Sequence, residues 1–190
     1  KTMDKLVIDI ETSNTFADVG GHENFKDLKV SLIGVYSYNK DKYFSFDENQ
    51  IADFEPMLKN AGLVIGFAIN RFDIPVLDKH YPFDLFALSR LDLLEEIELA
   101  LWQRISLNVL AKTNLGLEKT HASGLEAIKL YNEGNWEELR SYCLNDVKLT
   151  RDLYELARKQ GYLSVPDRNT GELLKAKLNF QEVELPATLF

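Results

Sequence analysis

One short run near the start of the chain constrains the fold more than any other. Leu6–Thr12 reads Leu-Val-Ile-Asp-Ile-Glu-Thr, a β-branched apolar segment of strand length that two carboxylates interrupt. Asp9 and Glu11 are two positions apart, so in a strand both side chains point to the same face. Two carboxylates on one face of a buried strand repel each other and lose solvation, and a cation offsets that cost. The segment between Leu6 and Lys26 contains no Lys or Arg, which favours a divalent metal ion; an Asp-x-Glu at the exposed end of an ordinary strand is the alternative.

Length and composition are typical of one soluble domain. The 190 residues are 45% apolar and 27% charged, so we expect a single domain over 1–190, with its core at 4–161 and a hairpin and tail at 162–190. The sequence has no long apolar stretch and no signal-peptide pattern, so we expect no membrane contact. The single cysteine, Cys143, excludes an internal disulfide and favours a cytoplasmic location. The net charge of −8 argues against a general nucleic-acid coat, but it leaves open an enzyme that meets phosphate through metal ions.

The hydrophobic pattern after the first strand predicts a mixed α/β fold. Val30–Tyr38 and Lys42–Phe46 read as two strands joined by a polar turn, so the first three strands are expected to form an antiparallel meander. A helix then precedes a buried strand at Leu63–Phe67, which predicts a crossover connection and a parallel strand. A further short strand is expected at Leu91–Leu93. The predicted sheet therefore has three antiparallel strands followed by two parallel strands, flanked by helices.

Two more aspartates follow strands of this predicted sheet. Asp73 lies just beyond the carboxyl end of the fourth strand, where open α/β sheets place their ligands; a helix-capping aspartate is the alternative. Asp92 opens the next helix, and we favour an N-cap role for it over that of an acidic neighbour of the site.

The last predicted helix begins after Asn135 and carries an apolar stripe at helical spacing. Asp146 falls inside that stripe, and Tyr142 lies one turn earlier on the same face. A buried carboxylate is costly unless it is paired or bound to a metal, so we favour a functional site over an ion pair with Arg151. Other boundaries are predicted at Ser106 and Ser123, which begin helices, and at 169–171, which turns a small hairpin.

These carboxylates fall into a recognisable order. The three motifs are Asp9-x-Glu11, then Phe72-Asp73 within Gly-Phe-x5-Asp-Ile-Pro, then Tyr142-x3-Asp146. Their order resembles that of the DEDDy branch of the DnaQ-like 3′–5′ exonucleases, in the ribonuclease-H-like superfamily. The resemblance spans 6–161 and looks closest to predicted exonucleases related to the proofreading domain of family-B DNA polymerases. It implies a ribonuclease-H-like sheet and cleavage at the 3′ end of single-stranded DNA or RNA, with release of nucleoside 5′-monophosphates.

The resemblance also implies a role for each matching residue. Two divalent ions, Mg²⁺ or Mn²⁺, would be held at the scissile phosphate, and a tyrosine would orient the attacking water. Thr12, Asn70 and Phe72 are expected to contact the substrate. The expected metal ligands are Asp9, Glu11, Asp73 and Asp146, and the expected tyrosine is Tyr142.

Two positions separate this chain from related families. A histidine branch would need a histidine at Ser141, so His22, His80 and His121 are expected to be surface or packing residues. Ala68 stands where the related proofreading domains usually carry an asparagine. Either Asn70 takes over that role or the contacts to the substrate strand differ.

Two other functions stay open at this point. One is a catalytically inactive ribonuclease-H-like domain that binds a partner or nucleic acid. The other is the nuclease module of a larger assembly, in which a helicase or polymerase partner supplies the remaining parts.

Overall fold

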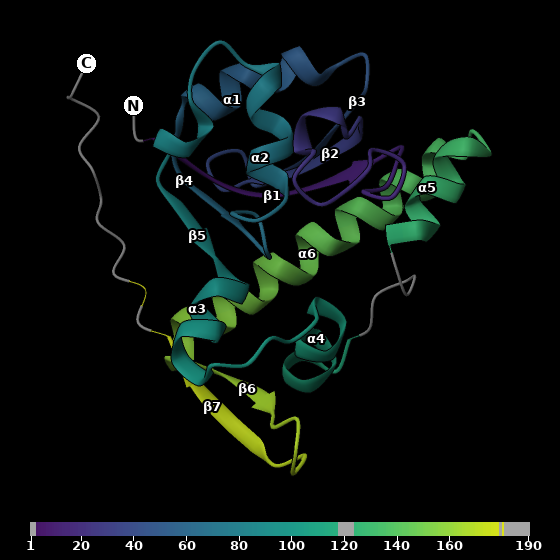
Figure 1. Cartoon of the computed structure of the whole chain (residues 1–190). Helices are drawn as coiled ribbons and strands as arrows, with labels where there is room; N and C mark the ends of the chain where they lie inside the picture. Colours follow the sequence, from purple (N-terminus) through teal and green to yellow (C-terminus); the bar gives the residue numbers. More distant parts are fainter. Residues whose placement is uncertain (1–2, 118–123, 179, 181–190) are drawn as a thin grey trace.

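One mixed five-stranded sheet forms the centre of the molecule (Figure 1). The computed structural model describes residues 3–117, 124–178 and 180. The strand order is β3-β2-β1-β4-β5, with β1–β2 and β2–β3 antiparallel and β1–β4 and β4–β5 parallel. The predicted α/β sheet, three antiparallel strands followed by two parallel ones, is therefore confirmed. The strands are β1 (Asp4–Thr12), β2 (Val30–Ser37), β3 (Lys42–Asp47), β4 (Ala61–Gly66) and β5 (Arg90–Asp92).

Helices cover both faces of this sheet (Figure 1). One face packs against α1 and α2, and the other packs against the long helix α6 together with α3 and α4. Helix α5 packs against α6. The helices are α1 (Glu55–Lys59), α2 (Asp73–Leu77), α3 (Leu93–Leu101), α4 (Leu107–Leu115), α5 (Gly124–Asn132) and α6 (Trp136–Gln160).

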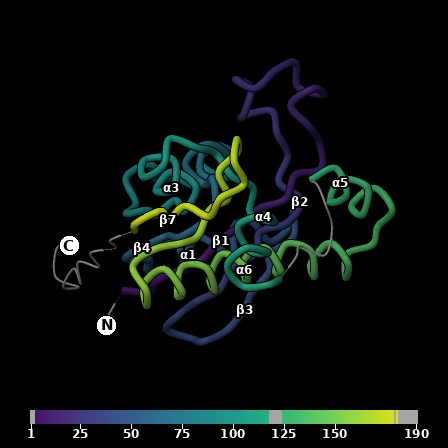
Figure 2. Tube along the Cα trace, turned by 90° about the horizontal axis from the view of Figure 1, so that it is seen from below, coloured from purple at the N-terminus to yellow at the C-terminus, as the bar shows by residue number. Residues whose placement is uncertain are grey.

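A hairpin of β6 (Tyr162–Pro166) and β7 (Leu173–Lys177) follows α6 and lies beside α3 and α4 (Figures 1 and 2). The predicted hairpin turn at 169–171 is thereby confirmed. The expected cap at Ser123, the residue His121 and the tail at 181–190 lie outside the described residues.

The alternation of side chains along β1 decides which helices its carboxylates face. Leu6, Ile8 and Ile10 belong to the apolar cluster shared with α1 and α2, whereas Val7 belongs to the cluster shared with α6. Because successive strand residues point to opposite faces, Asp9 and Glu11 share the face of Val7. The first strand therefore presents both acids toward α6.

A glycine lets α6 approach the sheet closely at the level of Asp9. Gly34 of β2 is the register partner of Asp9, and it lies beneath α6. A Cβ atom at this position would lie 2.7 Å from the Cys143 Sγ and 3.1 Å from a Val147 methyl group. Helix α6 thus packs almost directly on the backbone of β2, since Gly34 has no side chain to separate them.

Both ends of α6 are capped, and its start after Asn135 is the one that the sequence predicts. The Asn135 side chain accepts a hydrogen bond from the Glu138 amide, and Gly161 ends the helix in the left-handed conformation, with φ of 78°. Within the described residues, no helix is long and apolar enough to cross a membrane.

Candidate metal-dependent nuclease site

The two acids of β1 lie together on its α6-facing side. Glu11 is buried, with 7% of its surface exposed, whereas Asp9 is half-buried. One ligand atom from each of Asp9, Glu11 and Cys143 falls within 4.8 Å of the others. The register of β1 against β2 shifts between Glu11 and Thr12, so this acidic pair ends the regular part of the strand.

Helix α6 brings the second pair of predicted residues to the same place. Asp146 is 4% exposed, and it lines a pocket of about 480 Å³ together with Asp9. Tyr142 is buried one turn earlier. Burial, and after it the charges of Glu11, Asp146 and Asp9, raise the pKa of the Tyr142 hydroxyl above its usual value. The hydroxyl therefore stays protonated at neutral pH, within the electrostatic field of these three carboxylates.

Asp73 completes the group from α2. Its carboxylate accepts a hydrogen bond of 3.0 Å from the Ile10 amide, between the two acids of β1. Burial raises the pKa of Asp73 to about 7, and the charges of Asp92 and Asp146 act in the same direction. The N-cap position of α2 is Phe72, so Asp73 does not cap this helix. The structure thus gathers all five residues of the predicted site: Asp9, Glu11, Asp73, Tyr142 and Asp146.

Cys143 also lies close to these acids, but its chemistry argues against a ligand role. Its Sγ is 3.6 Å from a carboxylate oxygen of Asp9 and 3.5 Å from the Asp9 carbonyl oxygen. Burial, followed by the charges of Asp9 and Glu11, raises the pKa of the Cys143 thiol well above its usual range. Only a thiolate binds metals well, so we assign Cys143 as a packing residue that donates its S–H to Asp9.

The donor set fits a hard divalent cation. Carboxylate oxygens from two strand positions, one helix start and one helix interior lie close together, and those of Asp9 and Asp146 line the pocket. Mg²⁺ and Mn²⁺ prefer such oxygen ligands, whereas Zn²⁺ sites draw on histidine and cysteine. The burial of Asp73 and its raised pKa show that bringing its negative charge into this site is costly without a cation.

The expected substrate-binding residues have different surroundings. The Thr12 side chain is buried and donates to the Asn14 carbonyl oxygen at 2.9 Å. Phe72 packs on the core and makes an edge contact with the ring of Phe16, whose centroid is 5.8 Å away. The Asn70 amide group is held at both ends, because Nδ2 donates to Glu95 and Oδ1 accepts from Arg90. A substrate contact by Asn70 therefore requires exchange of these partners.

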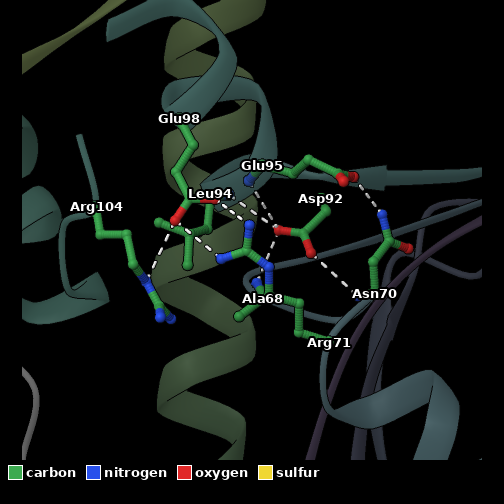
Figure 3. Close-up of polar contacts among 8 residues, drawn as sticks. All are labelled: Ala68, Asn70, Arg71, Asp92, Leu94, Glu95, Glu98 and Arg104. Atoms are coloured by element: carbon green, nitrogen blue, oxygen red, sulfur yellow. Dashed lines mark hydrogen bonds and ion pairs between the residues drawn. The ribbon is translucent and has the colours of Figure 1, made fainter. Parts of the chain in front are cut away.

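Asp92 holds the loop that separates β4 from Asp73 (Figure 3). Its carboxylate accepts hydrogen bonds from the amides of Ala68 at 2.8 Å and Asn70 at 3.0 Å. The same carboxylate caps α3 by accepting from the amides of Leu94 and Glu95. The predicted N-cap role is confirmed, and the contacts with the loop are an addition that the sequence did not indicate.

Ala68 adopts an unusual backbone conformation in that loop. Its φ is 65°, in the left-handed region that favours glycine and asparagine. Ala68 also lines the same pocket as Asp9 and Asp146. The position at which an asparagine was expected therefore faces the site, and its backbone conformation suits an asparagine.

Two arginines of the pocket were not singled out by the sequence. Arg104 follows α3, and Arg168 lies in the turn between β6 and β7. Neither position belongs to a periodic segment or a motif, so nothing local in the sequence marks them. The histidines bear out their predicted roles where the structure describes them, because His22 packs on Phe16 and His80 is partly buried. The pocket is lined by Asp9, Phe67, Ala68, Leu94, Arg104, Ile105, Ser106, Leu107, Asp146 and Arg168.

Comparisons with known proteins agree with this fold. A family model described as the RNase_H superfamily matches residues 6–158. Among solved structures, the family B DNA polymerase from the hyperthermophilic archaeon Pyrobaculum calidifontis is similar, with a TM-score of 0.63 and 17% sequence identity. The match covers 83% of this chain and 25% of the polymerase chain, so this chain spans about a quarter of that protein and shares its fold there. The comparison with curated proteins gave no significant match.

Proposed function

The chain belongs to the RNase_H superfamily, and within it we propose a metal-dependent 3′–5′ exonuclease that acts on single-stranded DNA or RNA. The products would be nucleoside 5′-monophosphates. One observation carries the proposal: four carboxylates and a tyrosine from β1, α2 and α6 lie close together, and two of these acids, Asp9 and Asp146, line a pocket. Such a convergence of buried acids is costly for folding and is explained by a shared ligand.

The carboxylates would hold two divalent metal ions at the scissile phosphate. When bound, such ions would supply charge stabilisation for the attacking and leaving oxygens of the phosphate and would make a water molecule more acidic. Asp9, Glu11, Asp73 and Asp146 are the oxygen ligands that we assign to them. The Ile10 amide fixes the orientation of the Asp73 carboxylate, and Cys143 does the same for Asp9.

Tyr142 would position the attacking water. Its pKa is raised, so at neutral pH its hydroxyl is a hydrogen-bond donor or acceptor and a poor base. The ring is buried among residues of α5, α6 and β2, which restricts its motion. A fixed hydroxyl beside the carboxylates is suited to hold a water molecule in line with the bond that breaks.

Incubation with end-labelled oligonucleotides tests the activity directly. The chain is incubated with single-stranded DNA and RNA in Mg²⁺, Mn²⁺ or EDTA, with either the 3′ or the 5′ end blocked. We expect stepwise shortening from a free 3′ end in Mg²⁺ or Mn²⁺ and none in EDTA. Asp9→Asn should reduce the rate by orders of magnitude, whereas Glu137→Gln, which removes an exposed acid of α6, should not.

The two alternatives predict other results in the same assay. An inactive domain would bind oligonucleotide without shortening it in either metal. A nuclease module would shorten it slowly alone and faster when a polymerase or helicase partner is added. The similarity to a polymerase that is four times as long as the match is the observation that keeps the second alternative in view.

A further inference from the structure

Two arginines line the pocket that Asp9 and Asp146 also line. We propose that Arg104 and Arg168 bind phosphates of the substrate strand on the 5′ side of the bond that is cleaved. This inference rests on the proposed exonuclease function and adds a substrate-binding wall to the same site. Both arginines line the pocket with Asp9 and Asp146, in a chain whose net charge is −8.

Glu98 holds one edge of the Arg104 guanidinium group, and the other edge points outward (Figure 3). Its Nε lies 3.2 Å from a carboxylate oxygen of Glu98, while its side chain is 63% exposed. The same carboxylate makes a two-pronged ion pair with Arg71. Glu98 therefore fixes the direction of the Arg104 guanidinium, and Figure 3 shows the two terminal nitrogens pointing away from Glu98. A planar guanidinium group whose terminal N–H donors point outward is well suited to bind phosphate oxygens.

Hydrogen bonds join Arg168, in the turn of the β6–β7 hairpin, to the segment that contains Arg104. Its Nη2 donates to the Arg104 carbonyl oxygen at 2.9 Å, and its amide donates to the Gln103 side chain at 3.1 Å. Gln103 in turn donates to the Pro166 carbonyl oxygen at 2.6 Å. The turn itself is stiffened because Asp167 accepts from the amides of Asn169 and Thr170. These bonds join two segments that are more than sixty residues apart and place both arginines at one pocket.

The start of α4 adds to the positive potential of this wall. Ser106, the N-cap, and Leu107, the first helical residue, both line the pocket. The first turn of α4 contains no acidic residue that would offset the partial positive charge of the helix start. A strand whose 3′ end lies at the carboxylates would therefore meet two guanidinium groups and a helix start within the same pocket.

A simple surface role is the competing explanation. Exposed ion pairs such as Arg104–Glu98 are common, and the Arg168 bonds are also those of a well-formed hairpin. Neither the ion pair nor the hairpin accounts for the presence of both arginines in the pocket that Asp9 and Asp146 line. Binding and cleavage measurements on two kinds of substrate separate the explanations.

The first experiment measures binding of a short fluorescent oligothymidylate by anisotropy, in Ca²⁺ and over a range of salt concentrations. Arg104→Gln and Arg168→Gln should each weaken binding about fivefold at 0.1 M salt and lower the salt slope by about 0.7, the value for one phosphate contact. Arg104→Lys keeps the charge and should keep most of the slope. Arg158→Gln is the matched control, because Arg158 lies twelve residues beyond Asp146 on α6, about 18 Å along the helix.

The second experiment measures cleavage of the p-nitrophenyl ester of thymidine 5′-monophosphate, which has one phosphodiester and no phosphate on its 5′ side. The two glutamine variants should lose much less of their kcat/KM for this ester than of their kcat/KM for the oligonucleotide, because their KM for the oligonucleotide rises. Three results would contradict the proposed phosphate-binding role of the two arginines. They are unchanged oligonucleotide binding in the glutamine variants, an equal loss of binding in Arg158→Gln, and a loss of ester cleavage equal to the loss of oligonucleotide cleavage. If the parent cleaves neither substrate, the exonuclease proposal fails, and the binding measurement still decides the role of the arginines.

Discussion

Tyr142 and Asp146 are one turn apart on α6, yet the roles we propose for them differ. Asp146→Asn should lose both Mn²⁺ affinity and cleavage, because a ligand oxygen loses its charge. Tyr142→Phe removes only a hydroxyl and keeps the ring packed, so Mn²⁺ binding should survive while the single-turnover rate falls on the order of 10²-fold. Calorimetric Mn²⁺ titration beside single-turnover cleavage measures both effects. A parental rate in Tyr142→Phe would reduce the tyrosine to a packing residue.

Substitutions at Ala68 can separate an effect on stability from an effect on substrate binding. Its φ of 65° costs an alanine about 1 kcal/mol, a strain that glycine or asparagine relieves. Ala68→Gly and Ala68→Asn should therefore both raise the free energy of unfolding by about 1 kcal/mol. Urea denaturation measures this change.

Only the asparagine variant adds a polar side chain to the pocket wall. It should also lower the KM for an oligonucleotide, whereas the glycine variant should leave it unchanged. Equal KM values in the two variants would show that the side chain at position 68 does not meet the substrate.

At the scale of elements, the position of α6 depends on a missing side chain. Gly34→Ala would place a Cβ 2.7 Å from the Cys143 Sγ, so α6 must shift or Cys143 must rotate. We expect a loss of about 1–3 kcal/mol in unfolding free energy. The single-turnover rate should also fall, on the order of 10²-fold for a displacement near 1 Å, because Asp146 moves with the helix. Gly124→Ala is the control, since a Cβ there would meet open space.

The sequence predicted the elements better than the loops that connect them. The strands Leu6–Thr12 and Val30–Tyr38 have clear period-two or apolar patterns, and α6 has a 25-residue stripe with a cap at each end, so these elements were found. The four carboxylates of the proposed site were singled out by these patterns, because a carboxylate on or beside a buried element is conspicuous, and the family resemblance added the role of Tyr142. The contacts of Asp92 with Ala68 and the pairing of Arg104 with the Arg168 hairpin were not found. They depend on long-range packing, which leaves no periodic mark in the local sequence.

The whole molecule should respond to pH through Asp73. Its pKa is raised from 3.8 to about 7, so the folded chain binds this proton more tightly than the unfolded chain. The contribution of Asp73 to the free energy of unfolding is therefore lost as pH rises through about 7. It grows as pH falls toward 3.8, the pKa of Asp73 in the unfolded chain. Urea unfolding of the metal-free chain at several values between about pH 5 and pH 8 measures the slope.

Asp73→Asn provides the reference for that measurement. The asparagine keeps an oxygen that can accept from the Ile10 amide, but it does not titrate. The stability of the parent should rise relative to that of the variant as pH falls from 8 to about 5. Parallel pH profiles would show that Asp73 does not carry the raised pKa in the metal-free chain.

The proposed ligands lie far apart in the sequence, with Asp9 on β1 and Asp146 on α6. A ribosome produces the strand early and the helix late, and the first elements can begin to associate while synthesis continues. A nascent chain that has not reached α6 lacks both the water-orienting tyrosine and one metal ligand. We therefore expect the growing polypeptide to be unable to cut nucleic acid, even the message from which it is translated, until translation of the domain is nearly complete.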